Sequence, residues 1–197
     1  SGDISNDGTK KSYIAYQKGI EHFEKPVFTI LGNHDNHKNF QVVFQTKLPS
    51  IKKIILSETW LIIAIDSTSI NRESGKITKQ QIYSLKKLIE NNKDKNLVLC
   101  LHHQPIKMGF WIDQVGLENS DQFIAAITNQ PNIKAVIWGH VHYESESRLE
   151  SIKMLSTPST CFQFCGNLEN PDTNRPGYRK INLFKSGKLE TKVIRID

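Results

Sequence analysis

Residues 133–142 read IKAVIWGHVH, an apolar run of strand length that ends in two histidines one residue apart. β-Branched and aromatic residues dominate the run, which is typical of a strand buried on both faces of a parallel sheet. Two similar runs lie upstream, PVFTIL at 26–31 and NLVLCL at 96–101, and a polar cluster follows each of them. We therefore expect three buried strands, each with polar side chains at its carboxyl end.

Helical patterns separate these strands. Residues 10–24 carry apolar side chains at helical spacing, and we expect that face to pack on the sheet. Thr78 and Gln81 form a capping box at the start of the next helix, and Ser120 is expected to cap a helix over 121–128. Alternating strands and helices predict the α/β class.

Further strands flank this alternating core. Residues 51–69 predict two strands around a turn, and the patterns at 145–159, 177–184 and 189–196 predict an antiparallel tail. The length suits one domain, so we expect a single domain over 1–197.

Composition excludes several functional classes. No run of 18 apolar residues exists to span a bilayer, and the first residues lack the pattern of a signal peptide. The three cysteines form no CxxC pair, which favours reduced thiols in a cytoplasmic protein. The net charge of +6 comes with scattered lysines, so we expect neither membrane association nor extended nucleic-acid binding, and the oligomeric state is left open.

The polar clusters at the strand ends predict a shared site. They are Asn33 to Asp35, His102 with His103, and His140 with His142. In open α/β sheets a site lies beyond the carboxyl ends of the strands, so these clusters should converge. Imidazole, amide and carboxylate ligands suit divalent iron, manganese or zinc, and the carboxylate of Asp3 is the candidate to bridge a pair of cations.

Each cluster also has a purely structural interpretation. Gly139 to His142 could form a surface loop, His102 and His103 could be buried and hydrogen bonded, and Gly32 to Asp35 could be a turn. Three such clusters at three strand ends would then be coincidence. The recurrence favours a metal site.

Four short motifs in order resemble the calcineurin-like metallophosphoesterase family: GD at 2–3, GNHD at 32–35, HHQP at 102–105 and GHVH at 139–142. This resemblance implies two packed mixed β-sheets flanked by helices. It also implies a metal-dependent enzyme.

Two further segments, GFWIDQVGLENSDQF at 109–123 and LSTPSTCFQF at 155–164, are similar to the bacterial cyclic-AMP phosphodiesterases of the Icc type. This likeness implies hydrolysis of 3′,5′-cyclic AMP to 5′-AMP by a hydroxide that bridges the metals. The alternatives are another phosphodiesterase of the family, acting on glycerophosphodiesters or nucleic-acid ends, and a scaffold protein that binds no metal.

The resemblance also implies a role for each residue in the motifs. Asp3 would bridge both cations, Asn33, His102 and His140 would bind the second, and His142 would bind the first.

The remaining roles follow from the same motifs. His34 would be the catalytic histidine that protonates the leaving oxygen, while Asp35 would orient or charge-pair with it. His103 would support the ligands without binding metal. The residues implied to contact the substrate are Asp3, Asn33, His34 and His142.

One departure from the family pattern concerns the first metal. The family carries an Asp-x-His motif at the end of a first strand, but only two residues precede Asp3 here. The first metal is left with Asp3 and His142. We therefore expect the fold to lack its first strands, and we expect this chain to be impaired as an enzyme.

Overall fold

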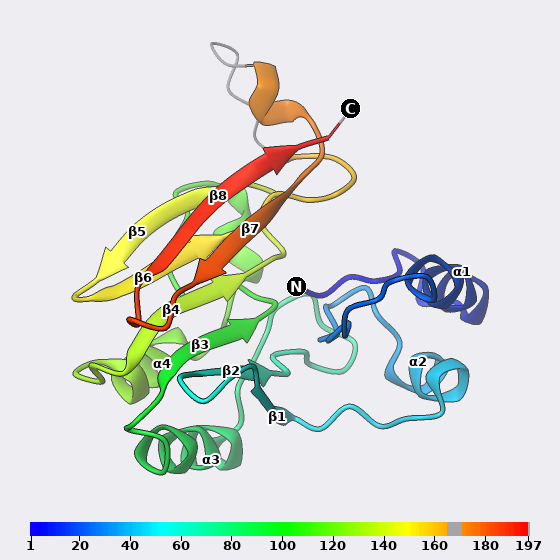
Figure 1. Cartoon of the computed structure of the whole chain (residues 1–197). Coiled ribbons are helices and arrows are strands. Elements are labelled where there is room, and N and C mark those ends of the chain that lie inside the picture. Colours follow the sequence, from blue (N-terminus) through cyan, green and yellow to red (C-terminus); the bar gives the residue numbers. More distant parts are fainter. Residues whose placement is uncertain (165–170, 197) are drawn as a thin grey trace.

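The computed structural model describes residues 1–164 and 171–196, and a mixed six-stranded sheet lies at its centre (Figure 1). The strands are β1 (Ile51–Ile55), β2 (Trp60–Ile65), β3 (Asn96–Leu101), β4 (Ile133–Trp138), β5 (Ser145–Leu149) and β6 (Ile152–Ser156). Their order is β1-β2-β3-β4-β6-β5. The four inner strands are parallel, and β1 and β5 pair antiparallel at the two edges. The predicted parallel core at β3 and β4 is confirmed.

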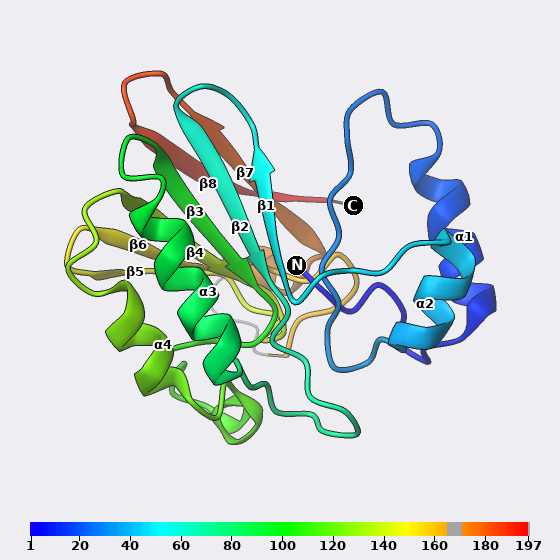
Figure 2. The same ribbon diagram turned by 90° about the horizontal axis from the view of Figure 1, so that it is seen from below.

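Helices α3 (Lys79–Glu90) and α4 (Ser120–Ile127) cover one face of this sheet (Figure 2). The capping box of Thr78 is present, and the buried face of α3 packs on a core that includes Leu85 and Phe123. The predicted cap of α4 was one residue late, because Asn119 is the N-cap and Ser120 is already helical. Two short 3₁₀ helices, η1 (Trp111–Val115) and η2 (Pro171–Asn174), lie in loops.

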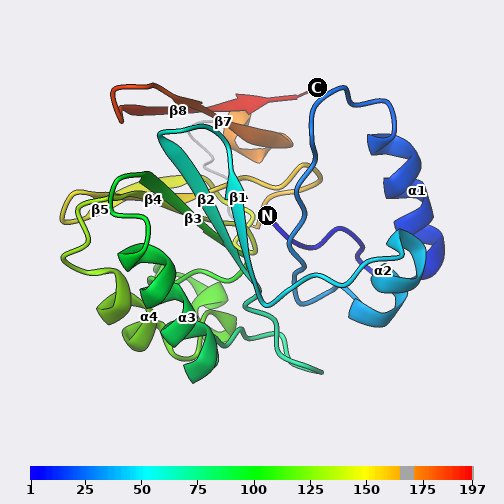
Figure 3. The same cartoon turned by 60° about the horizontal axis from the view of Figure 1, so that its bottom comes forward.

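A two-stranded antiparallel ribbon covers the opposite face (Figure 3). Its strands are β7 (Gly177–Leu183) and β8 (Leu189–Arg195). Leu189 packs with Val98 and Leu155 of the large sheet, and Trp60 Nε1 donates a hydrogen bond of 2.8 Å to the carbonyl of Phe184. This face forms a second, smaller core.

The helix expected over 10–24 is shorter and packs differently. Helix α1 (Lys10–Ile20) lies beside α2 (His37–Phe44), and the pair stands away from the sheet (Figure 2). Buried Tyr13 meets the ring of Phe40 at 5.5 Å, whereas Phe23 is 64% exposed. The expectation that this face packs on the sheet was wrong, because an unpredicted second helix covers it.

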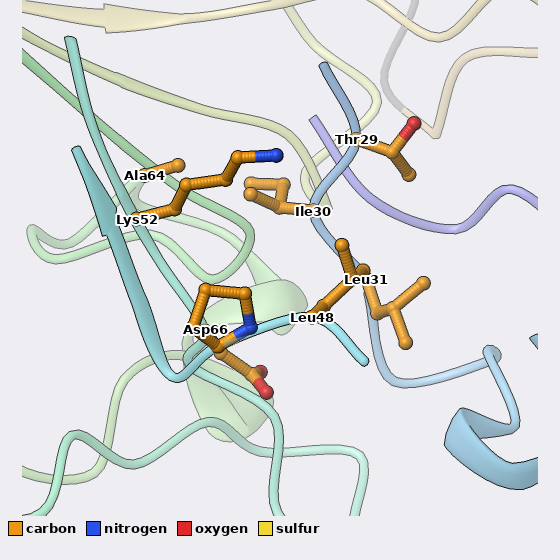
Figure 4. A pocket seen from close by; sticks show the side chains of 8 residues that line it. Thr29, Ile30, Leu31, Leu48, Lys52, Ala64 and Asp66 are labelled. Atoms are coloured by element: carbon orange, nitrogen blue, oxygen red, sulfur yellow. The ribbon is translucent and has the colours of Figure 1, made fainter. Parts of the chain in front are cut away.

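The strand expected at 26–31 is also absent. No strand in the described part of the chain pairs with this run, and Phe28 is exposed. The run lies over β1 and β2 instead, where Ile30 and Leu31 face Lys52 and Ala64 (Figure 4). A strand requires a hydrogen-bonded neighbour, so an apolar sequence alone does not form one. Among the described helices, none is long and apolar enough to cross a bilayer.

Candidate metal centre

The loops that follow β3 and β4 bring the histidines together, as the strand ends predicted. The rings of His102 and His140 lie 5.0 Å apart, and the amide of Gly139 donates to the carbonyl of His102 at 3.1 Å. The N-terminal residues cross this end of the sheet (Figure 1). A Cβ on Gly139 would lie 2.6 Å from the carbonyl oxygen of Ser1, so the close approach requires glycine there.

His102 is the centre of a group of acceptor atoms. Its Nδ1 lies 2.7 Å from the carbonyl oxygen of Ser1, which can only accept, so Nδ1 carries the hydrogen. In the neutral ring, Nε2 then presents a lone pair. That atom lies 3.0 Å from Asn33 Oδ1 and 3.3 Å from Asp3 Oδ2. Three converging acceptors with no proton between them fit a bound cation.

His140 and His142 supply two more unpaired nitrogens. His140 Nε2 and His142 Nδ1 are buried, and neither has a hydrogen-bond partner among the described residues. Buried polar atoms normally have a partner, so these atoms also fit metal ligation. Both residues have positive φ, 63° and 43°, a strained conformation for non-glycine residues that recurs at functional sites.

The environment keeps these rings neutral, as metal binding requires. Burial is the main cause that lowers the pKa of His140 to about 3, although the nearby carboxylate of Asp3 raises it. Burial also lowers the pKa of His142. Neutral imidazole is the form that donates a lone pair to a cation.

Asp3 is held as a carboxylate. Burial raises its pKa, but when the His102 ring carries a second proton in place of a cation, its hydrogen bond and charge, with the amide of His34, outweigh burial and leave the pKa well below its ordinary value. The amide of His34 donates to Oδ1 at 3.0 Å. A Cβ on Gly32 would lie 2.1 Å from the same Oδ1, so glycine is required beside this carboxylate.

His34 is exposed, and its main chain contacts Asp3. Its Nδ1 lies 3.1 Å from the carbonyl oxygen of Asn6, which makes Nδ1 the donor and orients the ring. No hydrogen bond to its Nε2 occurs in the described part of the chain. Nε2 is therefore the atom that can exchange a proton with a substrate.

Asp35 organises the loops rather than pairing with the His34 ring. Its carboxylate accepts hydrogen bonds from the amides of Ile4, Ser5 and Gly32, and from the hydroxyl of Tyr13. These donors come from the loop that carries Asp3, from the GNHD loop and from α1. We expected Asp35 either to orient His34 or to form a charge pair with it. The structure shows no charge pair between these two side chains.

His103 belongs to the same buried cluster as His102 and His140, whose ligand atoms all lie within 4.8 Å of one another. Both of its nitrogens are already bonded, Nδ1 to Ser67 Oγ at 2.8 Å and Nε2 to the carbonyl of Glu73 at 3.0 Å. Burial and the two neighbouring histidines lower its pKa to about 2. With both nitrogens occupied, a supporting role for His103 stays a prediction.

Sequence reasoning missed two residues of the site. Ser67 follows β2 and accepts the amides of His102 and His103 at 3.3 and 3.2 Å. Phe164 stacks on His142, with ring centroids 4.2 Å apart and planes 3° apart. Ser67 could have been found as the polar residue after another apolar strand, whereas nothing local marks Phe164.

Comparisons with known proteins show the family of this chain. A family model described as calcineurin-like phosphoesterase matches residues 1–144. A 3′,5′-cyclic adenosine monophosphate phosphodiesterase of Vibrio vulnificus is 32% identical over all of this chain and 73% of the relative. The Escherichia coli K12 enzyme of the same name is 30% identical with the same coverage.

Solved structures show the same fold. The chain is similar to GAP50, described as the anchor in the inner membrane complex of Plasmodium, with a TM-score of 0.70, 16% identity and coverage of 98% and 72% of the two chains. A dimetal phosphatase from Danio rerio gives a TM-score of 0.63 at 9% identity, with coverage of 94% and 77%. With its motifs, its histidine cluster and these matches, the chain belongs to the calcineurin-like phosphoesterase family, as a metal-dependent enzyme.

Proposed function

We propose that the protein is a metal-dependent phosphodiesterase that hydrolyses 3′,5′-cyclic AMP to 5′-AMP. The observation that carries the proposal is the contact of three acceptor atoms, on Asp3, Asn33 and His102, in a site that also holds two unpaired histidine nitrogens. The lone pair of His102 faces the oxygens of Asp3 and Asn33, and the unpaired nitrogens of His140 and His142 lie on the same cavity wall or beside it. The relatives named as cyclic-nucleotide phosphodiesterases support the choice of substrate.

Five residues would hold the cations. Asp3, Asn33, His102 and His140 would hold one cation, and Asp3 with His142 would hold the other, which has fewer ligands, so we expect this chain to be impaired as an enzyme. When bound, divalent iron, manganese or zinc would supply Lewis acidity toward the phosphoryl oxygens and lower the pKa of a water molecule. The donor set of nitrogen and oxygen atoms suits all three cations.

His34 would act as the general acid. Its Nδ1–H bond to the carbonyl of Asn6 holds the ring, so Nε2 can deliver a proton to the departing 3′ oxygen of the ribose. The amide side chain of Asn33 lies in the same loop and would contact a phosphoryl oxygen. Asp3 and His142 would complete the contacts to the phosphate.

The role of His34 is tested by its alanine variant. His34→Ala should lower kcat on cyclic AMP by about 10²–10⁴-fold, the usual contribution of a general acid. The manganese content, measured by elemental analysis, should not change, since His34 is no ligand. His22→Ala serves as the matched control, because His22 is also exposed but lies beyond α1. Full activity of His34→Ala would refute the assignment.

The choice of substrate needs a separate measurement. A manganese-dependent assay compares cyclic AMP with a glycerophosphodiester and with an oligonucleotide end. Equal rates on all three would refute specificity for the cyclic nucleotide, and failure to bind manganese would favour a scaffold protein. We also propose a cytoplasmic location, which the free thiols of Cys100 and Cys161 support.

A further inference from the structure

Three aromatic rings form a shelf next to the candidate metal centre. We define this aromatic shelf as Trp111, Phe162 and Phe164. Phe164 stacks on His142 at 4.2 Å, Phe162 meets the same histidine at 4.9 Å, and Trp111 meets Phe164 at 5.0 Å. Phe162 and Phe164 therefore contact the candidate metal ligand His142 directly, and Trp111 contacts it through Phe164.

The shelf is assembled from distant parts of the sequence. Trp111 begins η1, after β3, whereas Phe162 and Phe164 follow β6. The chain segment 157–160 that leads to these phenylalanines also lines the cavity containing Asp3, His102 and His140. The shelf is thus continuous with the wall of the metal cavity.

Core packing does not explain two of the rings. Trp111 is 52% exposed and Phe162 is 53% exposed, while the other two tryptophans, Trp60 and Trp138, are at most 3% exposed. Single exposed aromatic residues are common on protein surfaces. Here two of them contact Phe164, the ring that stacks on the candidate metal ligand His142, which places both beside the site.

We propose that Trp111 and Phe162 stack on the purine base of the nucleotide, and so select nucleotides from other phosphodiesters. This inference rests on the proposed function. The metal cavity is lined mostly by polar residues and suits the phosphate, and the base of a nucleotide bound there would extend past the ribose toward a neighbouring surface. Exposed aromatic faces bind nucleobases by stacking, with little dependence on which base is present.

A second cleft borders the site on the side of Asn33, and it is a less suitable place for a base. Its lining includes His37, Asp66, Thr68 and Ile70. The side chains of this cleft are mostly polar, and His37 Nε2 is already bonded to Thr68 Oγ1 at 2.8 Å. Ile70, 90% exposed, offers no aromatic face.

Binding of 5′-AMP and ribose 5-phosphate to the manganese-loaded protein tests the shelf without turnover. Isothermal titration of Trp111→Ala should show 5′-AMP bound about 5- to 150-fold more weakly, the range expected for one stacked base. Ribose 5-phosphate, which has no base, should bind as it does to the wild type. Trp111→Phe should recover most of the affinity, and Trp111→Leu should recover less because it has no aromatic ring.

Tyr83→Ala is the matched control, since Tyr83 is 53% exposed but lies on α3. It should leave both affinities unchanged. Equal weakening of both ligands by Trp111→Ala would overturn the proposal, because it would show a structural role. No change in either would also overturn it, and a base-dependent loss in Ile70→Ala would then place the base in the other cleft.

Hydrolysis separates this inference from the proposed function. In Trp111→Ala, kcat/KM for cyclic AMP should fall by the same factor as 5′-AMP affinity, mainly through KM. A protein that binds 5′-AMP through Trp111 but, with two cations bound as shown by elemental analysis, does not cleave cyclic AMP would refute the proposed function alone. A protein that cleaves cyclic AMP with no dependence on Trp111 would refute the shelf alone.

Discussion

Asp35→Asn tests how the loop that carries Asp3 is held. Each oxygen of the Asp35 carboxylate accepts two hydrogen bonds. Oδ1 accepts from the Ser5 amide and the Tyr13 hydroxyl, both at 3.0 Å, and Oδ2 accepts from the amides of Ile4 at 3.0 Å and Gly32 at 2.9 Å. Asparagine keeps one oxygen and places an NH₂ group where the other was. Two of the four donors would then face another donor.

The expected loss follows from those two hydrogen bonds. A hydrogen bond to a charged group contributes about 1.5–3 kcal/mol. Because the Asp35 site is only partly buried, we take the lower value for each bond and expect unfolding free energy to fall by about 3 kcal/mol. The loosened loop carries Asp3, so manganese affinity should fall on the order of tenfold to a hundredfold, as for other groups that orient ligands.

Urea unfolding of metal-free protein, followed by circular dichroism, measures the first effect, and isothermal titration with manganese measures the second. Asp94→Asn is the control, because the Asp94 side chain is 74% exposed in a turn away from the site. If Asp35→Asn changed neither stability nor manganese affinity, the reasoning would be refuted. A change confined to the pH profile of kcat would instead support the charge pair with His34 that the structure does not show.

Three other variants or conditions test separate features. Gly32→Ala should lower manganese affinity at least tenfold by displacing Asp3, since the added Cβ would lie 2.1 Å from Oδ1; unchanged affinity in a titration would contradict this. The pKa of His103 is about 2 in the folded protein and ordinarily about 6.5, so its neutral form stabilises the fold above pH 6.5 and that contribution is lost as the pH falls. Through His103, metal-free protein should therefore lose about 1 kcal/mol of stability to urea between pH 7 and pH 5.5, beside the loss through His140, and His103→Gln should reduce the slope by that amount, whereas an identical slope would exclude His103 as a source. Thr78→Ala removes the capping box with Gln81 and should lower stability by about 1 kcal/mol, seen as a lower Tm; an unaltered Tm would show that α3 does not depend on its cap.

Local patterns in the sequence predicted the elements whose stabilising contacts are local or repeated. The strands β3 and β4 were predicted from uninterrupted apolar runs, and helix α3 from its capping box. The sequence also predicted that His102 and His140 lie close together, because neighbouring parallel strands end at the same edge of a sheet. These predictions required no knowledge of distant contacts.

Long-range contacts decided the remainder. The run at 26–31 has the composition of a strand, but no described strand pairs with it, so it lies as an extended segment over β1 and β2. Helix α1 packs on α2 rather than on the sheet because α2 was not visible in the sequence pattern. Whether the run at 26–31 forms a strand, and what α1 packs against, depends on distant segments of the chain that the local sequence pattern does not reveal.

The same division applies to the site. The sequence by itself determined which residue types stand at the strand ends, and hence the nitrogen and oxygen chemistry of the candidate centre. Only the tertiary structure decided which nitrogens are free to face a cation: His102 presents Nε2 because its Nδ1 is bonded to Ser1, and both nitrogens of His103 are occupied by Ser67 and Glu73. The physical reason is that a ring nitrogen is directed by its hydrogen-bond partner, and these partners lie far away in the chain.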